Sequence, residues 1–153
     1  MRTKRDAVLM DKRRVLLVGD AQVAAMLKEY FGYNNIYEGE SIKYCEDALM
    51  MLRRRPFDLV LLLSFNAPWR TWSSLSSPAW NIESSSAILF LKQLRALLQP
   101  PPVIVVSGSL RADVEASAFA NGAFAFFHKP FKFADLDRLL ALACAMPQPE
   151  AGG

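Results

Sequence analysis

The fold class is decided by the run Phe57-Asp-Leu-Val-Leu-Leu-Leu63, in which the last five residues are all apolar. A short, unbroken apolar run of this kind predicts a strand that is buried on both faces of a sheet. Val103–Val106 is a second such run, and Arg14–Val18 has the same character. Strands covered on both faces are typical of parallel sheets with helices packed above and below, so the sequence predicts an α/β protein.

Helical patterns alternate with these strands along the chain. Apolar residues recur at helical spacing in Ala21–Phe31, Tyr44–Arg54, Ala87–Leu98, Arg111–Asn121 and Phe131–Ala145. Two further segments, Ile36–Ser41 and Ala123–Phe127, complete a set of five strands. Because each crossover is long enough for parallel pairing, we expect a doubly wound, three-layer (βα)5 sandwich with a five-stranded parallel sheet.

Composition supports one globular domain. The chain has 153 residues, of which 52% are hydrophobic and 22% charged, and this balance excludes wholesale disorder. We expect a domain over 13–145, preceded by a basic tail, 1–12, and followed by a Pro/Gly-rich tail, 146–153. Six of the 18 basic residues lie within residues 1–14. The body carries no basic stripe, so we do not expect the domain itself to bind nucleic acid.

The sequence also bears on the cellular compartment. No apolar run approaches the roughly 20 residues that a membrane span requires, and no signal-peptide-like stretch follows the charged N-terminal residues. Cys45 and Cys144 are too few for a disulfide scaffold or a four-cysteine zinc site. We therefore expect a cytoplasmic protein with two structural thiols and no membrane partner.

One connection is unusually long. Residues 64–86 contain eight serines and all three tryptophans, Trp69, Trp72 and Trp80. Serine and proline indicate a loop, whereas three indoles are unusual for a flexible linker. Three interpretations stay open: an insertion that buries its own indoles on the domain, a surface for a partner or ligand, since tryptophan is enriched at interface anchors, or a disordered loop.

Five motifs follow one another at the expected strand ends and turns. They are Arg14–Asp20, Gly32–Ile36, Pro56–Leu63, Pro102–Gly108 and Asn121–Phe131. Together they resemble the receiver domain of two-component response regulators, and the 22 positions from Ser107 to Lys129 match the spacing of that family. The resemblance covers roughly residues 13–145. It implies the flavodoxin-like receiver topology and a role in bacterial signal transduction.

The resemblance also assigns the positions of the phosphorylation site. It places the acidic pair at Gly19 and Asp20, the phosphoacceptor at Leu63, the switch hydroxyl at Ser107, the switch aromatic at Phe126, and the Lys-Pro signature at Lys129 and Pro130, with a cis peptide bond between them. The hydroxyl and the ammonium contact phosphoryl oxygens in the family.

Two of these positions depart from the family. Gly19 offers no metal ligand, and Leu63 offers neither a ligand nor a nucleophile. Phosphoryl transfer to an aspartate needs that acceptor and a divalent metal held by carboxylates. The sequence therefore indicates a pseudo-receiver that has no catalytic residues, is not an enzyme, and uses no metal or other cofactor. We expect Lys129 to pair with Asp20 instead.

The function expected from this reading is phosphorylation-independent protein–protein interaction. By family analogy the partner surface is the face built from 111–121, 123–127 and 131–145, through which the chain could also form a homodimer. The alternative is a domain that senses a small molecule or anion, held by Lys129 and Ser107 under the Trp-rich loop.

A third interpretation is a working receiver with a displaced acceptor, at Ser64 or Asp58. No base lies near Ser64 in the sequence to activate its hydroxyl. Asp58 begins the third strand and so lies at the wrong end of the sheet. The sole histidine, His128, has no cysteine or carboxylate cluster near it in sequence, so neither a metal-binding nor a catalytic role is expected for it.

Overall fold

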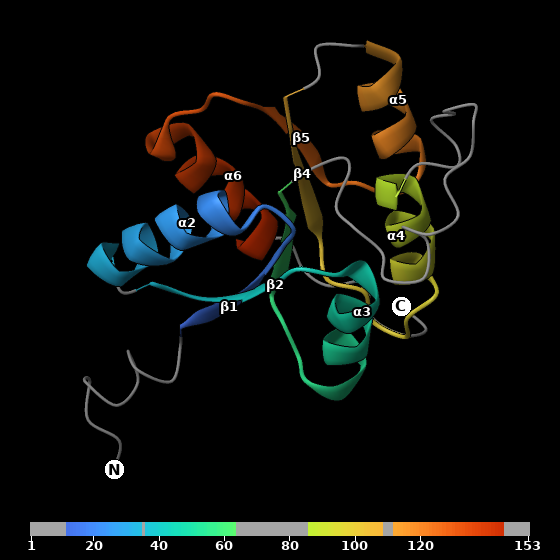
Figure 1. The fold of residues 1–153 in the computed structure, drawn as a ribbon, viewed down its shortest axis with the longest axis horizontal. Coiled ribbons are helices and arrows are strands. Elements are labelled where there is room, and N and C mark those ends of the chain that lie inside the picture. Colours follow the sequence, from blue (N-terminus) through green and yellow to red (C-terminus); the bar gives the residue numbers. More distant parts are fainter. Residues whose placement is uncertain (1–11, 35, 64–85, 109–111, 146–153) are drawn as a thin grey trace.

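The computed structural model describes residues 12–34, 36–63, 86–108 and 112–145. Strands and helices alternate through these ranges (Figure 1). The strands are β1 (Arg13–Val18), β2 (Tyr37–Ile42), β3 (Leu59–Leu62), β4 (Val103–Ser107) and β5 (Ala125–His128). The helices are α2 (Ala21–Asn34), α3 (Cys45–Arg54), α4 (Ser86–Arg95), α5 (Ala112–Ala120) and α6 (Phe133–Ala145).

The strands form one parallel sheet in the order β2-β1-β3-β4-β5. This confirms the predicted doubly wound fold. The connections from β1 lead outward to β2 on one side, whereas those from β3 lead outward to β4 and β5 on the other. The reversal occurs between β1 and β3, and in open α/β sheets the crevice at such a point, beyond the carboxyl ends of the strands, is the usual place for a functional site.

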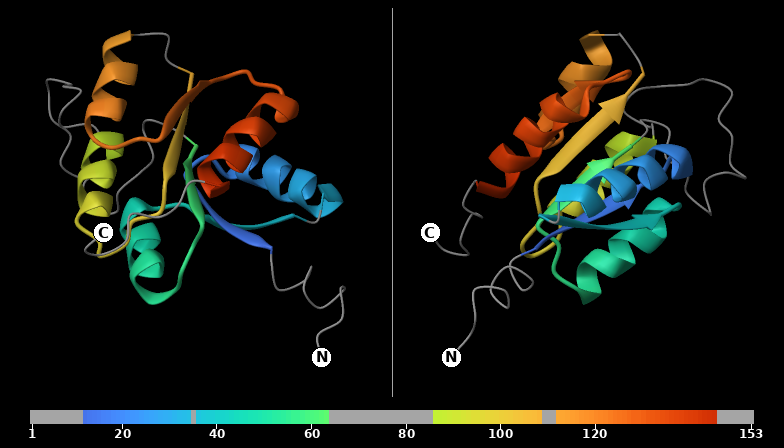
Figure 2. Two further views of the ribbon diagram at one scale, coloured as in Figure 1. Left: turned by 180° about the vertical axis from the view of Figure 1, so that it is seen from behind. Right: turned by 90° about the vertical axis from the view of Figure 1, so that its left-hand side faces the viewer.

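Alternate residues of each strand face opposite helical layers. Leu16, Val60 and Val105 pack with α3, α4 and α5 on one face. Leu17, Leu61 and Ile104 pack with α2 and α6 on the other. Figure 2 shows the sheet between these two layers. Both faces are covered, which explains why the strands read as unbroken apolar runs instead of alternating ones.

The structure corrects the expected end of the first helix. The sequence predicts a helix over Ala21–Phe31, before Gly32, but α2 continues to Asn34. Glycine costs a helix only about 1 kcal/mol relative to alanine, and packing of Phe31, which is 1% exposed, offsets that cost. Met26 belongs to the apolar spacing that predicts this helix, yet it is 54% exposed, because Ala24, Leu27 and Phe31 occupy the side that faces the sheet.

The helix expected over 87–98 also ends earlier, at Arg95. The amides of Ala96 and Leu97 bond to carbonyls three residues back, those of Gln93 and Leu94. This tighter turn changes the rotation of the chain, so Leu98 is 92% exposed rather than part of the apolar face. Three prolines follow at 100–102 and prevent the helix from resuming.

In the C-terminal part of the chain, two elements begin later than the sequence predicts. Strand β5 lies two residues later than expected at its start, and α6 begins at Phe133 instead of Phe131. The helix expected over 111–121 ends at Ala120, and Gly122 follows it with a φ of 103° that only glycine adopts without strain. No helix within the described ranges is long and apolar enough to cross a membrane. The predictions for the two tails and for Trp69, Trp72 and Trp80 fall on residues outside these ranges.

Candidate functional site

The residues assigned to the phosphorylation site gather at the carboxyl edge of the sheet. Backbone hydrogen bonds join the strand ends there: the amide of Leu63 donates to the carbonyl of Val18 over 2.8 Å, and the amide of Lys129 donates to that of Ser107 over 2.9 Å. The same edge carries Gly19, whose φ is 93°. The parallel topology thus brings together chain positions more than 100 residues apart, as the sequence predicted.

Asp20 and Lys129 form the charged centre of this site. The Lys129 ammonium Nζ lies 3.2 Å from Asp20 Oδ2, which confirms the predicted pair. Asp20 Oδ1 accepts a hydrogen bond from the amide of Val23 over 3.2 Å, so the same carboxylate caps the start of α2. The peptide bond between Lys129 and Pro130 is cis, also as predicted.

Several effects act on the Asp20 carboxylate. Partial burial raises its pKa, but the hydrogen bond from the Val23 amide and the contact with the Lys129 ammonium outweigh burial, so the pKa of Asp20 is lowered from its ordinary value. Each side chain keeps about a third of its surface exposed, at 31% for Asp20 and 27% for Lys129. Asp20 is therefore a carboxylate at neutral pH, and its negative charge is already matched by a cation.

Leu63 lies at the position that the family resemblance assigns to the phosphoacceptor. Its side chain is 0% exposed and packs in the same apolar cluster as Leu61, Leu136 and Leu140. A leucine in this place has no atom that attacks a phosphoryl group or ligates a metal. The site therefore has a core residue where the family resemblance would put its reactive one.

Two other assigned residues, Ser107 and Phe126, lie on β4 and β5. Ser107 is 3% exposed at the end of β4. Phe126, which the resemblance assigns as the switch aromatic, is partly buried, and its ring makes an edge contact with His128 at 5.2 Å between centroids. His128 Nε2 lies 3.1 Å from Glu115 Oε1, which links β5 to α5.

The donor set of this edge does not fit Mg²⁺. Magnesium in proteins is typically held by one or two carboxylates together with phosphate oxygens and waters. Here the first acidic position is Gly19, and the one assigned carboxylate, Asp20, is held by Lys129. Within the described segments, no three His, Cys, Asp or Glu side chains come together as a metal cluster.

Asp58 lies where the sequence placed it, away from this edge. Its Oδ2 accepts a hydrogen bond from the amide of Arg14 over 2.8 Å, at the start of β1 and β3. The displaced-acceptor interpretation therefore receives no support from Asp58. The second candidate for it, Ser64, falls outside the described residues.

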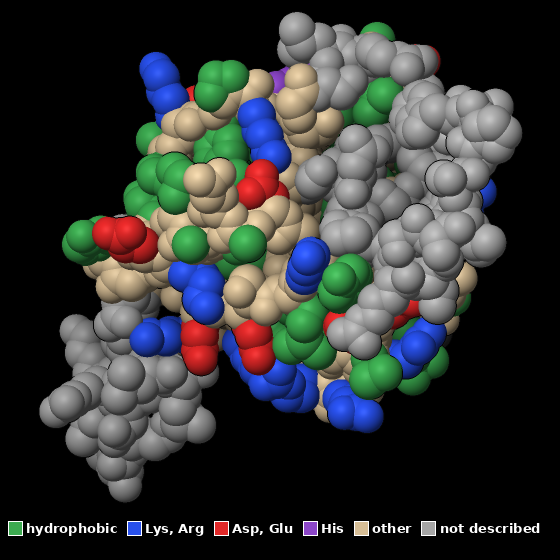
Figure 3. All heavy atoms as spheres, viewed as in Figure 1, with side chains coloured by type: hydrophobic (Ala, Val, Ile, Leu, Met, Phe, Trp, Pro, Cys, Tyr) green, Lys and Arg blue, Asp and Glu red, His purple; other side chains and the backbone are tan. Residues whose placement is uncertain are grey.

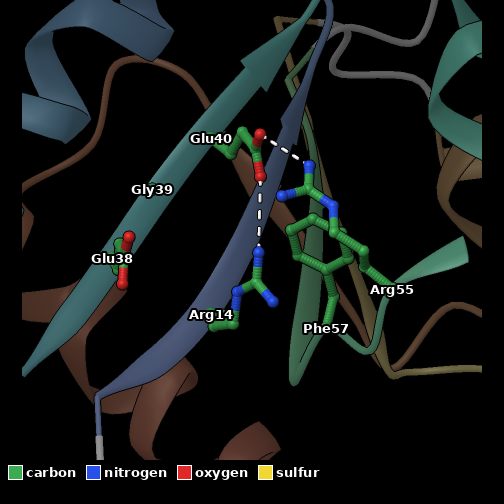
Figure 4. Close-up of a pocket in the computed structure, with 6 residues that line it drawn as sticks. All are labelled: Arg14, Glu38, Gly39, Glu40, Arg55 and Phe57. Carbon is green, nitrogen blue, oxygen red and sulfur yellow. Dashed lines mark hydrogen bonds and ion pairs between the residues drawn. The ribbon is translucent and has the colours of Figure 1, made fainter. Parts of the chain in front are cut away.

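Two features were missed by sequence reasoning. Tyr30 donates a 2.6 Å hydrogen bond to Asp137 and stacks on Phe133, which ties α2 to α6. A pocket of about 280 Å³ lies at the opposite end of the sheet, where Arg14 and Arg55 flank Glu40 (Figure 4). The run Arg53-Arg54-Arg55 could have indicated this pocket from the sequence. Its place on the surface, however, depends on the fold.

Comparisons with solved structures place this arrangement among known folds. The receiver domain of HemR from Leptospira biflexa superposes with a TM-score of 0.70 at 22% identity, covering 92% of this chain and 100% of that one. The chain has the receiver-domain fold. A CheY-like receiver domain from Methylobacillus flagellatus gives a TM-score of 0.64 at 23% identity, covering 86% of this chain and 98% of that one.

A third similar structure carries a metal. The receiver domain of a sensor histidine kinase from Pseudomonas aeruginosa PAO1, whose structure has a magnesium ion coordinated in its active-site cleft, gives a TM-score of 0.63 at 20% identity, covering 88% of this chain and 99% of that one. No family model and no curated protein matched the chain. Identities in this range establish the receiver-like fold alone, and the function has to be argued from the site.

Proposed function

We propose that this chain is a pseudo-receiver, a receiver-like domain that transmits a signal by contact with a protein partner and not by phosphorylation. The observation that carries the proposal is Leu63, buried in the apolar core at the acceptor position. Gly19 and the paired Asp20 support it, because a metal-assisted transfer to this edge lacks ligands as well as an acceptor. On this proposal the domain is not an enzyme, requires no cofactor, and acts in the cytoplasm of a bacterium.

Intact mass after incubation with acetyl phosphate and Mg²⁺ tests the proposal. We expect no phosphoryl adduct on this chain under conditions that fully modify an ordinary receiver domain run in parallel. A stoichiometric adduct would reject phosphorylation independence. Peptide mapping would then identify the acceptor, with Ser64 as the first position to check.

The proposed partner surface is the face formed by α5, β5 and α6. Phe119 is 45% exposed, and it stands one turn after Glu115, which contacts His128 of β5. Leu142 is 58% exposed and lies on the side of α6 turned away from the Asp137 contact with α2. Two large apolar side chains thus flank the edge strand β5, an arrangement that suits a protein interface better than solvent.

We expect the Phe119→Glu/Leu142→Glu double variant to weaken self-association through this face at least tenfold, since it buries two charges in the contact. Sedimentation equilibrium over a range of protein concentrations measures the effect. Met26→Glu/Tyr33→Glu on α2 is the matched control, because these side chains are comparably exposed, at 54% and 80%. Equal weakening by the control pair rejects this face, and a wild-type chain that is monomeric throughout rejects the homodimer.

The alternative function, sensing of a small molecule or anion, has less support. An anion that binds Lys129 would have to displace the Asp20 carboxylate, which lies 3.2 Å from the ammonium. Calorimetric titration with inorganic phosphate distinguishes the two functions. Binding that is lost in Lys129→Ala, with the circular dichroism spectrum unchanged, would favour the sensor over the interaction domain.

A further inference from the structure

A groove of about 390 Å³ lies at the end of the domain opposite the Asp20–Lys129 pair. It is lined by residues 52–56, which form the end of α3 and the turn after it, and by residues 97–99, which follow α4. Both segments lead into the amino ends of strands, β3 and β4, whereas the candidate site lies at the carboxyl ends. We call this hollow the arginine groove, because Arg53, Arg54 and Arg55 line one side of it.

Arg55 is held in a fixed position at the border of the groove. Its Nη2 lies 2.7 Å from Glu40 Oε1, and its guanidinium stands 5.7 Å from the centre of the Phe57 ring. Arg14 approaches the same two partners, at 3.7 Å from Glu40 and 5.0 Å from the ring (Figure 4). The Glu40 carboxylate is thus shared by the guanidinium groups of Arg14 and Arg55. It does not neutralise the charges of the other arginines in the groove.

Arg53 and Arg54 are exposed and have no carboxylate partner among the described residues. Both stand in the last turn of α3, where a positive charge favours the helix C-terminus. The interaction with the helix C-terminus explains why basic residues stand at the end of α3. It does not explain the apolar side chains on the opposite wall of the groove. Leu98 is 92% exposed on that wall, next to the half-buried Leu97.

Arginine beside exposed leucine suggests the chemistry of the ligand. Arginine is enriched in protein interfaces and binds carboxylates through two parallel hydrogen bonds. Figure 3 shows Lys and Arg side chains gathered at the lower end of the molecule, the end where α3 terminates. Two uncommitted arginines are too few for a nucleic-acid or membrane surface, which needs a wider basic area, whereas they suit a short acidic segment.

We propose that the arginine groove binds an acidic, leucine-bearing segment of a partner protein. Carboxylates of that segment pair with Arg53 and Arg54, and an apolar side chain of the segment covers Leu97 and Leu98. The groove lies away from both the Asp20–Lys129 pair and the α5–β5–α6 face, so this contact is independent of the function proposed above. A partner bound there leaves that face free for a second contact.

The test uses the full chain and a fluorescein-labelled synthetic peptide of alternating glutamate and leucine, with fluorescence anisotropy as the readout. We expect saturable binding that Arg53→Glu/Arg54→Glu weakens at least tenfold. Leu98→Ser should weaken it several-fold, since this exposed side chain is not part of the core. Lys28→Glu/Lys132→Glu is the matched control, because it makes the same change in net charge at exposed positions outside the groove. Thermal unfolding checks every variant, and Arg53→Gln/Arg54→Gln replaces the reversal if the latter fails to fold.

Each outcome bears on the proposal. Absence of peptide binding, or equal weakening by the control pair, overturns it. Loss of binding when leucine in the peptide is replaced by serine supports the apolar contact, and unchanged binding rejects that contact. Tighter binding of a single-stranded oligonucleotide or of phosphatidylserine vesicles, with the same dependence on Arg53 and Arg54, shows that the class of partner is wrong. None of these results depends on whether the chain is phosphorylated.

Discussion

Leu63→Asp is expected to lower the free energy of unfolding by more than about 3 kcal/mol, which is a large part of the 5–15 kcal/mol that stabilises a typical domain. Truncation of a buried leucine to alanine costs about 2–5 kcal/mol, and a carboxylate adds the penalty of burying a charge without a partner. Leu63 is 0% exposed among Leu61, Leu136 and Leu140. Urea unfolding followed by circular dichroism measures the change.

Two controls separate burial from the chemistry of the substitution. Leu98→Asp makes the same replacement at a 92% exposed position, and we expect a change within about 0.5 kcal/mol. Leu63→Met keeps volume and apolarity, and we expect a loss below about 1.5 kcal/mol. A Leu63→Asp variant as stable as the wild type, and modified by acetyl phosphate, would show that the site is a receiver pocket lacking only its acceptor.

Because of this expected cost, we do not expect a single substitution to create a phosphorylation site here. The position of the first family acid is Gly19, whose φ of 93° is strained for any residue with a Cβ atom. A left-handed conformation costs a non-glycine residue roughly 1–2 kcal/mol. Restoring the acid and the acceptor together would therefore combine backbone strain with a buried charge, at an edge where Asp20 already serves as a helix cap.

Much of the fold followed from sequence because periodicity and strand burial are local properties. The run ending at Leu63 and the run Val103–Val106 were predicted as buried strands, and both lie in the middle of the sheet. The pairing of Asp20 with Lys129 was predictable because parallel topology brings strand ends to one edge. That prediction needed only the element order and the assignment of Asp20 and Lys129 to the carboxyl ends of β1 and β5.

Other features depend on how each helix is rotated against the sheet and on which segments meet in space, and the sequence alone does not determine either. Leu98 and Met26 fit an apolar spacing, but small changes in helix length and orientation left both side chains in solvent. The arginine groove forms because the C-terminal end of α3 and the segment that follows α4, which are distant in sequence, meet near the amino ends of β3 and β4. The predicted role of the Trp-rich loop stays a prediction, because it falls outside the described residues.

Cys45 is expected to react with a thiol reagent roughly a thousandfold more slowly in the folded protein than in the unfolded chain at pH 8. Burial raises the pKa of this thiol to about 12 from its ordinary value of 9.0, and the neighbouring Glu46 carboxylate acts in the same direction. The thiolate is the reactive species, so the higher pKa lowers the thiolate population at pH 8 by roughly a thousandfold. The side chain is also 0% exposed in the core next to α4, which further limits access.

The measurement is the rate of reaction with a disulfide reagent in a Cys144→Ser variant, in buffer and in concentrated urea. Removal of Cys144 leaves one thiol, so the two rates refer to Cys45 alone. The reciprocal Cys45→Ser variant reports Cys144, which is only half-buried, and we expect it to react faster in the folded state. A native rate for Cys45 within tenfold of the unfolded rate would contradict a purely structural role. Such a rate would mean that the α3 side of the core opens readily enough for redox chemistry to reach it.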